Sequence, residues 1–290
     1  MGAWGPGLYS SDLAMDLRPL IAALARLPIP DGDVHRHAAD ANPGVADDPS
    51  DEDHTTFWLV LADQLAKKGI DCPLTRARAL DIIDSGADIA TMRALGMEER
   101  DLRKRQRNLA AIRAQILAAA AVPARPRTVL KKPQPFIVET GDCLVFPTAG
   151  GQAINPYFPS RQAQGFVQDG WGAALVVDRG RTLDYLAWYR MAALRHACAD
   201  KPSMEQVMQA RLAGGIGVGT CSPAHFKRME MERIGQLALR ADAIAAIVAG
   251  GAGAGSPDMV AIHDISISNS LMLGAGLGGS DDEPLVRDLL

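Results

Sequence analysis

A cluster of prolines near the middle of the chain limits how far any helix or strand can run. Four prolines fall between residues 123 and 135, together with two arginines and two lysines. Proline cannot donate a backbone hydrogen bond, and it disfavours a helical conformation in the residue before it. We therefore predict a basic, proline-rich linker over 122–135, which separates a helical domain over 1–121 from an α+β domain over 136–290.

Several segments of the first domain have the spacing of helices. Residues 55–68 begin with two threonines, which are suitable caps, and are followed by a glycine. Residues 73–86 begin with proline and end with glycine, so the two segments predict an antiparallel helical hairpin. Residues 98–120 predict a long further helix.

The start of the first helix has two alternative positions. A cap at Ser11 or Asp12 places Pro19 inside the helix, whereas a cap at Asp16 places it in the first turn. Asp12 and Asp16 share one face if both are helical. They could form a carboxylate pair for metal or acid–base chemistry, or one of them could pair with the terminal amine. We favour a third interpretation, a cap and a charge that the helix dipole stabilises.

The first residues follow the pattern Met-Gly-x-Trp-Gly-x-Gly, then a polar stretch, then Asp-x-x-x-Asp. A helical segment with Phe57 and Trp58 follows, and residues 79–86 match a third element. This succession resembles an uncharacterised bacterial domain family over about the first 120 residues. The resemblance implies a small helical domain without established catalytic residues. Its signature residues in this chain are Gly2, Trp4, Gly5, Gly7, Asp12, Asp16 and Trp58.

An acidic segment follows the first predicted helix. Residues 31–54 contain eight carboxylates and a single arginine, and few of their side chains are apolar, so we predict a solvated loop. Its candidate binding residues are Asp47, Asp48, Asp51, Glu52 and Asp53. His35, His37 and His54 could instead bind a metal, but their spacing matches no structural zinc site, and we expect no metal and no cofactor.

Basic side chains concentrate on the long helix and the linker. Residues 98–132 carry ten basic and three acidic side chains. Arg103, Arg105 and Arg107 are the candidates for contacts with a nucleic-acid backbone. The alternative, which we favour, is a solvated helix face that the acidic loop balances.

The second domain combines short apolar runs with glycine-rich turns. We predict a small antiparallel sheet or an SH3-like barrel with added helices. The predicted strands are 136–139, 143–146, 173–177, 182–187 and 259–267, and the predicted helices are 202–212, 223–239 and 241–248. The glycine-rich stretches 214–220, 250–255 and 274–279 follow no strand-to-helix pattern of a nucleotide site, so we predict loops there.

A cysteine next to a predicted helix start offers a different chemistry. Cys221 at a helix N-terminus would have a lowered pKa, and His225 or the pair His263 and Asp264 could activate it as a nucleophile. The alternative is a buried cysteine beside Ser222, which caps the helix.

Charge and cysteine spacing narrow the function classes. The net charge of −4 is too small to indicate nucleic acid or a membrane as the main partner. We expect neither a signal peptide nor a membrane span, and widely spaced cysteines favour a cytoplasmic protein. Our first hypothesis is a non-catalytic, immunity-type protein that sequesters a partner protein through the acidic segment. A cysteine-dependent enzyme and a nucleic-acid-binding protein are the alternatives.

Overall fold

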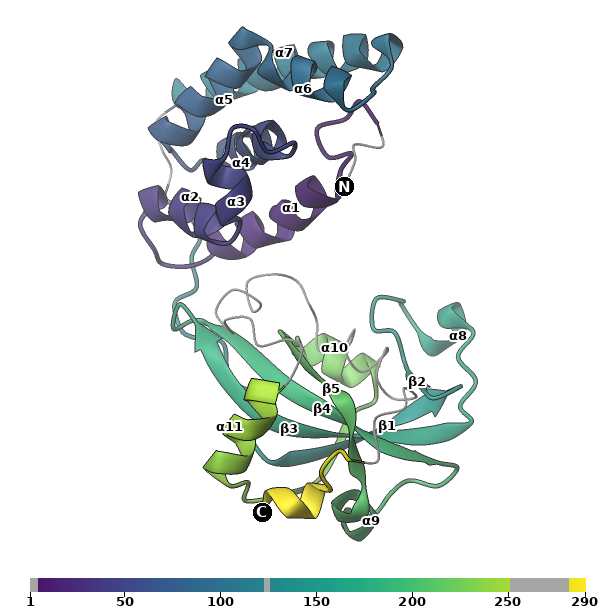
Figure 1. Ribbon diagram of the computed structural model, residues 1–290. Helices are drawn as coiled ribbons and strands as arrows, with labels where there is room; N and C mark the ends of the chain where they lie inside the picture. The colour runs from purple at the N-terminus through teal and green to yellow at the C-terminus, as the bar shows by residue number, and fades with distance from the viewer. Residues whose placement is uncertain (1–4, 123–125, 251–281) are drawn as a thin grey trace. The chain divides into compact units, whose positions relative to one another are not determined.

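The computed structural model describes residues 5–122, 126–250 and 282–290, and it has the expected α+β class. The chain forms two compact units, Met1–Lys131 and Lys132–Leu290, and their boundary falls inside the segment predicted as the linker. The first unit is helical and the second is built on a curled antiparallel sheet (Figure 1). Along the described residues, none of the helices has the length and apolar character needed to cross a membrane.

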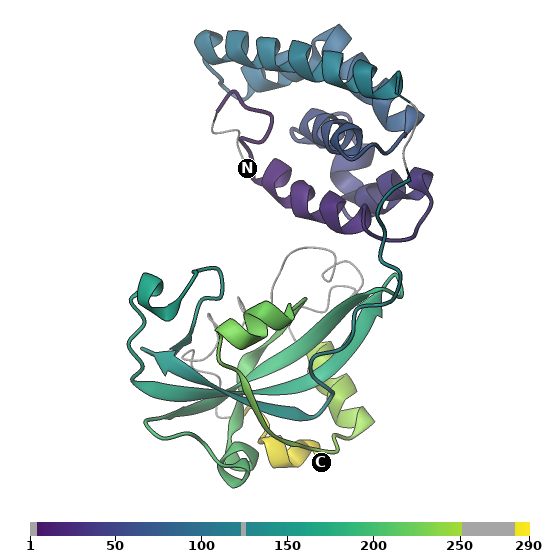
Figure 2. The same cartoon turned by 180° about the vertical axis from the view of Figure 1, so that it is seen from behind.

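The first unit packs its helices around a central one. Its helices are α1 (Asp12–Leu24), α2 (Asp31–Asp40), α3 (Pro43–Asp47), α4 (His54–Lys67), α5 (Pro73–Ser85), α6 (Ala87–Ala94) and α7 (Glu99–Ala120). In two opposite views α4 lies between α1 on one side and α5 and α7 on the other (Figures 1 and 2). Every residue of α4 from His54 to Leu65 is buried, as expected for a helix with neighbours on all sides.

The helix ends follow the local signals of the sequence. Ser11 caps α1 and accepts a hydrogen bond from the Ala14 amide, so Pro19 lies inside the helix and not in its first turn. The predicted hairpin of α4 and α5 is confirmed, and Gly86 ends α5 in the left-handed conformation at a φ of 74°. The long helix is confirmed as α7.

The acidic segment is not the predicted loop. Residues 31–47 form α2 and α3, because Val34, Ala38 and Ala46 enter the core and give these short helices a buried side. Only residues 48–53 connect α3 to α4 without a helix or strand of their own.

The sheet of the second unit has the order β2-β1-β3-β4-β5, and β6 also pairs with β1. All of its pairings are antiparallel. Its strands are β1 (Asp142–Ala149), β2 (Gln152–Ala153), β3 (Gly170–Thr182), β4 (Leu186–Cys198), β5 (Arg211–Gly219) and β6 (Glu232–Gln236). The helical elements between and after them are α8 (Arg161–Gln164), α9 (Met204–Gln209), α10 (Pro223–Arg228), α11 (Ala241–Gly250) and the 3-10 helix η1 (Val286–Leu289).

Both faces of the sheet are covered. Phe146, Tyr189 and Met229 belong to a core on one face, whereas Leu175 and Leu289 belong to a core on the other. A strand that is buried on both faces of a sheet has a continuous run of apolar residues in its sequence. This explains why 143–146 and 173–177 were recognisable as strands, and both lie within β1 and β3.

Several predicted elements of the second unit are wrong. Residues 136–139 form no strand, and 182–187 enclose the β3–β4 turn, where Leu183 and Asp184 have positive φ angles as in a type I′ hairpin. The predicted helix 223–239 divides into α10 and β6, and the glycine-rich stretch 214–219 belongs to β5. Backbone pairing with β4 and β1 outweighs the local pattern in these places. The predictions for 259–267 and 274–279, and nearly all of 250–255, lie outside the described residues.

We expect Gly141→Ala to lower the free energy of unfolding by at least about 2 kcal/mol, because an added Cβ would combine steric overlap with a left-handed backbone. Gly141 has a φ of +85°, and a Cβ there would lie 2.0 Å from the Leu237 carbonyl oxygen. Gly165→Ala is the control, since its φ is +69° with no atom within 4 Å, and should cost about 1 kcal/mol. Urea unfolding of both variants measures the difference, and equal losses would contradict this account.

Candidate functional site

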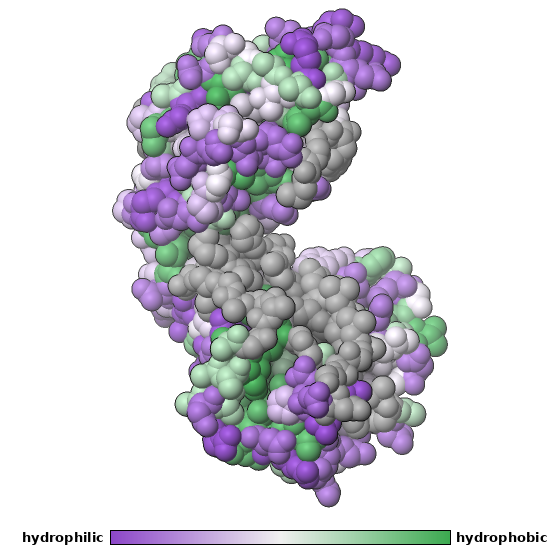
Figure 3. All heavy atoms as spheres, viewed as in Figure 1, coloured by the Kyte–Doolittle hydropathy of each residue, from purple (hydrophilic) through white to green (hydrophobic). Residues whose placement is uncertain are grey.

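We use the name acidic surface for five carboxylates that run from the last residue of α3 to the residue before α4, namely Asp47, Asp48, Asp51, Glu52 and Asp53. Asp47, Asp48 and Glu52 are exposed, and the other two are half-buried. The view in Figure 3 shows hydrophilic residues over much of the first unit. A dense set of carboxylates on a folded surface attracts basic partners.

Local hydrogen bonds order the acidic surface. Asp48 Oδ1 accepts from the Ser50 amide at 2.9 Å and from the Ser50 hydroxyl at 2.6 Å. These two bonds hold the pKa of Asp48 below its usual value. Asp51 Oδ1 accepts from the Asp53 amide at 2.8 Å. These bonds stabilise the local turns at Asp48 and Asp51.

Two side chains of α4 hold this segment against the core. The Trp58 indole nitrogen donates to the Ala46 carbonyl at 3.2 Å, and His54 Nδ1 lies 2.8 Å from the Val45 carbonyl. A carbonyl oxygen only accepts, so Nδ1 of His54 carries the proton. The signature residue Trp58 and the metal candidate His54 thus both have a structural role.

The other metal candidates do not join His54. His35 is half-buried, and its Nδ1 atom is buried without a hydrogen-bond partner among the described residues. Burial lowers the pKa of His37. Across the described ranges, no three side chains of His, Cys, Asp or Glu come together as they would around a metal ion.

The acidic surface and the start of α1 share one electrostatic environment. Burial raises the pKa of Asp53, and the charges of Asp51, Glu52 and Asp12 raise it further. Asp12 and Asp16 are both exposed on α1. Asp12 thus adds a charge from a segment distant in sequence, an arrangement that the sequence could not show.

The glycine signature is held by α7. Gly2 and Trp4 lie outside the described residues, and Gly5 and Gly7 are half-buried. The Gly7 carbonyl accepts from Arg105 at 3.2 Å, and the preceding carbonyl, of Pro6, accepts from Asn108.

Arg105 is not an exposed binding residue. Its side chain is 2 % exposed and forms a bidentate ion pair with Asp88 of α6, at 2.6 and 2.7 Å. A buried arginine next to apolar residues requires such a partner, because an unpaired charge inside a protein is strongly destabilising. Arg103 and Arg107 remain exposed on the same helix.

Other basic residues of this stretch have acidic partners in their own unit. Arg113 forms an ion pair with Asp84, and Lys104 with Asp101. Arg127 pairs with Asp31 and donates to three backbone carbonyls that follow α1. The predicted basic strip is thus partly neutralised and partly structural, whereas Arg100, Arg103 and Arg107 stay exposed on α7.

We expect Arg105→Met to lower the free energy of unfolding by about 3–5 kcal/mol, because it leaves Asp88 buried without its partner. Arg103→Met and Arg107→Met are matched controls on the same helix and should change stability by about 0.5 kcal/mol or less. Chemical denaturation gives the three values. Equal effects would show that Arg105 is not structurally different from its exposed neighbours.

A buried polar network joins the N-terminal segment to α4 and α7. Asp63, which is 1 % exposed, accepts from the Tyr9 hydroxyl, from Lys67 Nζ at 2.7 Å and from Gln115 Nε2 at 3.1 Å. Burial and the hydrogen bond to Asp63 raise the pKa of Tyr9. This network was not predicted from the sequence, although an aspartate within the apolar helix 55–68 was a signal for it.

Cys221 does not have the environment of a nucleophile. It is half-buried beside the core of the sheet, and burial raises the pKa of its thiol to about 12. Ser222 caps α10 as predicted. The expected lowering of the thiol pKa is wrong, because the effect of burial on the pKa is larger than that of the N-terminus of this short helix. The His225 ring packs edge-on against the Tyr157 ring, and the two ring centroids are 4.9 Å apart. His263 and Asp264 lie outside the described residues.

We expect Cys221 to react slowly with iodoacetamide at pH 7. With a pKa of about 12, its thiolate fraction is on the order of a thousandfold below that of an unperturbed cysteine. The rate should rise about tenfold per pH unit between pH 7 and 10. Peptide mapping after timed labelling measures it, with glutathione as the reference thiol, and rapid saturable labelling at pH 7 would revive the enzyme hypothesis.

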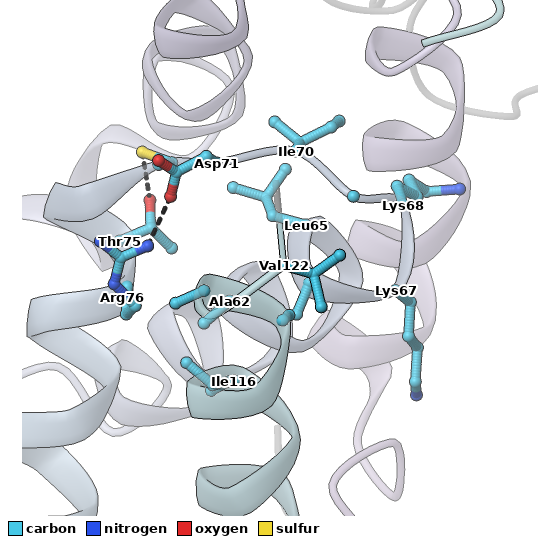
Figure 4. A pocket seen from close by; sticks show the side chains of 15 residues that line it. Ala62, Leu65, Lys67, Lys68, Ile70, Asp71, Thr75, Arg76, Ile116 and Val122 are labelled. Atoms are coloured by element: carbon cyan, nitrogen blue, oxygen red, sulfur yellow. Dashed lines mark hydrogen bonds and ion pairs between the residues drawn. The ribbon is translucent and has the colours of Figure 1, made fainter. Parts of the chain in front are cut away.

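A cavity of about 390 Å³ opens in the first unit (Figure 4). It lies between the C-terminal ends of α4 and α7 and the start of α5. Leu65, Ile70 and Ile116 line it and are each less than 5 % exposed. The sequence analysis did not predict this cavity, because its walls come from three separate helices.

Comparisons with protein-family models, with curated proteins and with solved structures found no match for this chain.

Proposed function

We propose that this protein is a non-catalytic, immunity-type or accessory protein of the bacterial cytoplasm that sequesters a partner protein. The observation that carries the proposal is the acidic surface, in which Asp48 and Asp51 accept backbone hydrogen bonds and Trp58 of α4 holds the preceding Ala46 carbonyl. A surface that is already ordered loses little conformational entropy when it binds. Its charge favours a basic partner and speeds their association.

The partner's complementary feature is a patch of lysine and arginine side chains. Asp47 and Asp48 are exposed next to one another, and Glu52 and Asp12 extend the negative surface. Charge pairs at the rim of an interface act mainly on association rate and on the choice of partner. We therefore expect binding to weaken with increasing salt.

Substitution tests this proposal better than deletion. Removing residues 33–53 would take Val34, Ala38 and Ala46 out of the core and would unfold the unit. The variant Asp47→Asn/Asp48→Asn removes two charges and keeps the oxygen that accepts from Ser50. Asp81→Asn/Glu98→Gln is the matched control, since both residues are exposed on the same unit and the charge change is equal.

We expect the immobilised full chain to capture one stoichiometric protein from host lysate at about 0.1 M salt and to release it at about 1 M, where the Debye length falls from about 10 to about 3 Å. The Asp47/Asp48 variant should lose most of this capture, and the control should keep it. Equal capture by both variants would exclude the acidic surface as the binding site. Recovery of nucleic acid would point to Arg103 and Arg107 instead.

A further inference from the structure

The cavity between α4, α5 and α7 has two kinds of wall. Apolar side chains form the central part of its lining, and two polar pairs form one side of it (Figure 4). Those pairs are Arg76 with Asp71, and the Cys72 thiol with the Thr75 hydroxyl at 3.1 Å. The lining therefore combines apolar and polar groups, and its volume of about 390 Å³ lies within the size range of small-molecule sites between helices.

The positive and negative side chains around the cavity do not balance. Lys67 is bound to Asp63, and Arg76 is bound to Asp71. Lys68 also lines the cavity, and it forms no ion pair with any residue that the structure describes. It lies on the side of the cavity opposite the Asp71–Arg76 pair, and its side chain extends outward, away from Leu65 (Figure 4). The rim therefore has one positive charge in excess.

We propose that this cavity binds a small amphipathic carboxylate, with its alkyl tail against Leu65, Ile70 and Ile116 and its carboxylate at the rim near Lys68. The apolar lining removes the tail from water, which favours binding with each added methylene. The flexible lysine stem lets the ammonium group meet the carboxylate while it stays partly solvated. This site is separate from the acidic surface, and the proposal does not rest on the proposed function.

Calorimetric titration of the full chain with sodium butyrate, hexanoate, octanoate and decanoate tests the proposal. We expect saturable binding at one site, with affinity rising up to about fourfold per methylene until the tail fills the cavity. The uncharged 1-octanol should bind about fivefold more weakly than octanoate. Absence of saturable binding for every chain length would overturn the proposal, and equal binding of octanol would overturn the role of the carboxylate.

Two variants with matched controls locate the site. Ala119→Phe fills the cavity and should abolish octanoate binding, whereas Ala118→Phe, on the exposed side of α7, should leave it unchanged. Lys68→Gln should weaken octanoate about fivefold without changing octanol, and Lys131→Gln should have no effect. Unchanged binding by a folded Ala119→Phe variant would overturn the assignment. If that variant does not fold, the comparison of Lys68→Gln with Lys131→Gln tests the position of the site, and equal octanoate binding by both would overturn it.

Discussion

Arg105 and Asp88 lie almost fully out of water and are held together by two hydrogen bonds, and the arrangement of the first unit depends on this pair. Neither charge could stay buried without the other, so α6 and α7 must meet in one register. The same guanidinium donates to the Gly7 carbonyl and so fixes the N-terminal segment against α7. One arginine therefore positions three separate parts of the chain.

The central helix α4 extends this arrangement to the surface. Two of its buried side chains are held by hydrogen bonds: Asp63 binds Tyr9, Lys67 and Gln115, and Trp58 binds the Ala46 carbonyl. A buried polar network that is fully satisfied favours one packing over its alternatives. The acidic surface is attached to this core at both ends, because α4 follows Asp53 and Trp58 binds the Ala46 carbonyl just before Asp47.

The proline-rich segment is less free than its composition indicates. Arg127 donates to carbonyls of Ala25, Leu27 and Ile29 within the first unit. Gln134 exchanges hydrogen bonds with Tyr185 and Ala187 within the second unit. Each end of the predicted linker is thus part of the unit next to it, and Arg127 has a structural role that a count of charges could not show.

The sequence by itself determined the elements whose signals are local. The cap at Ser222, the glycine end of α5, the long helix α7 and the apolar runs of β1 and β3 were all readable, because capping and burial patterns act within a few residues. Tertiary structure alone decided the rest. The glycine-rich β5 exists through pairing with β4, and the burial of Arg105, the raised pKa of Cys221 and the cavity beside Lys68 all arise from neighbours distant in sequence. Side-chain burial and charge pairing between such neighbours are set only when the whole chain has packed.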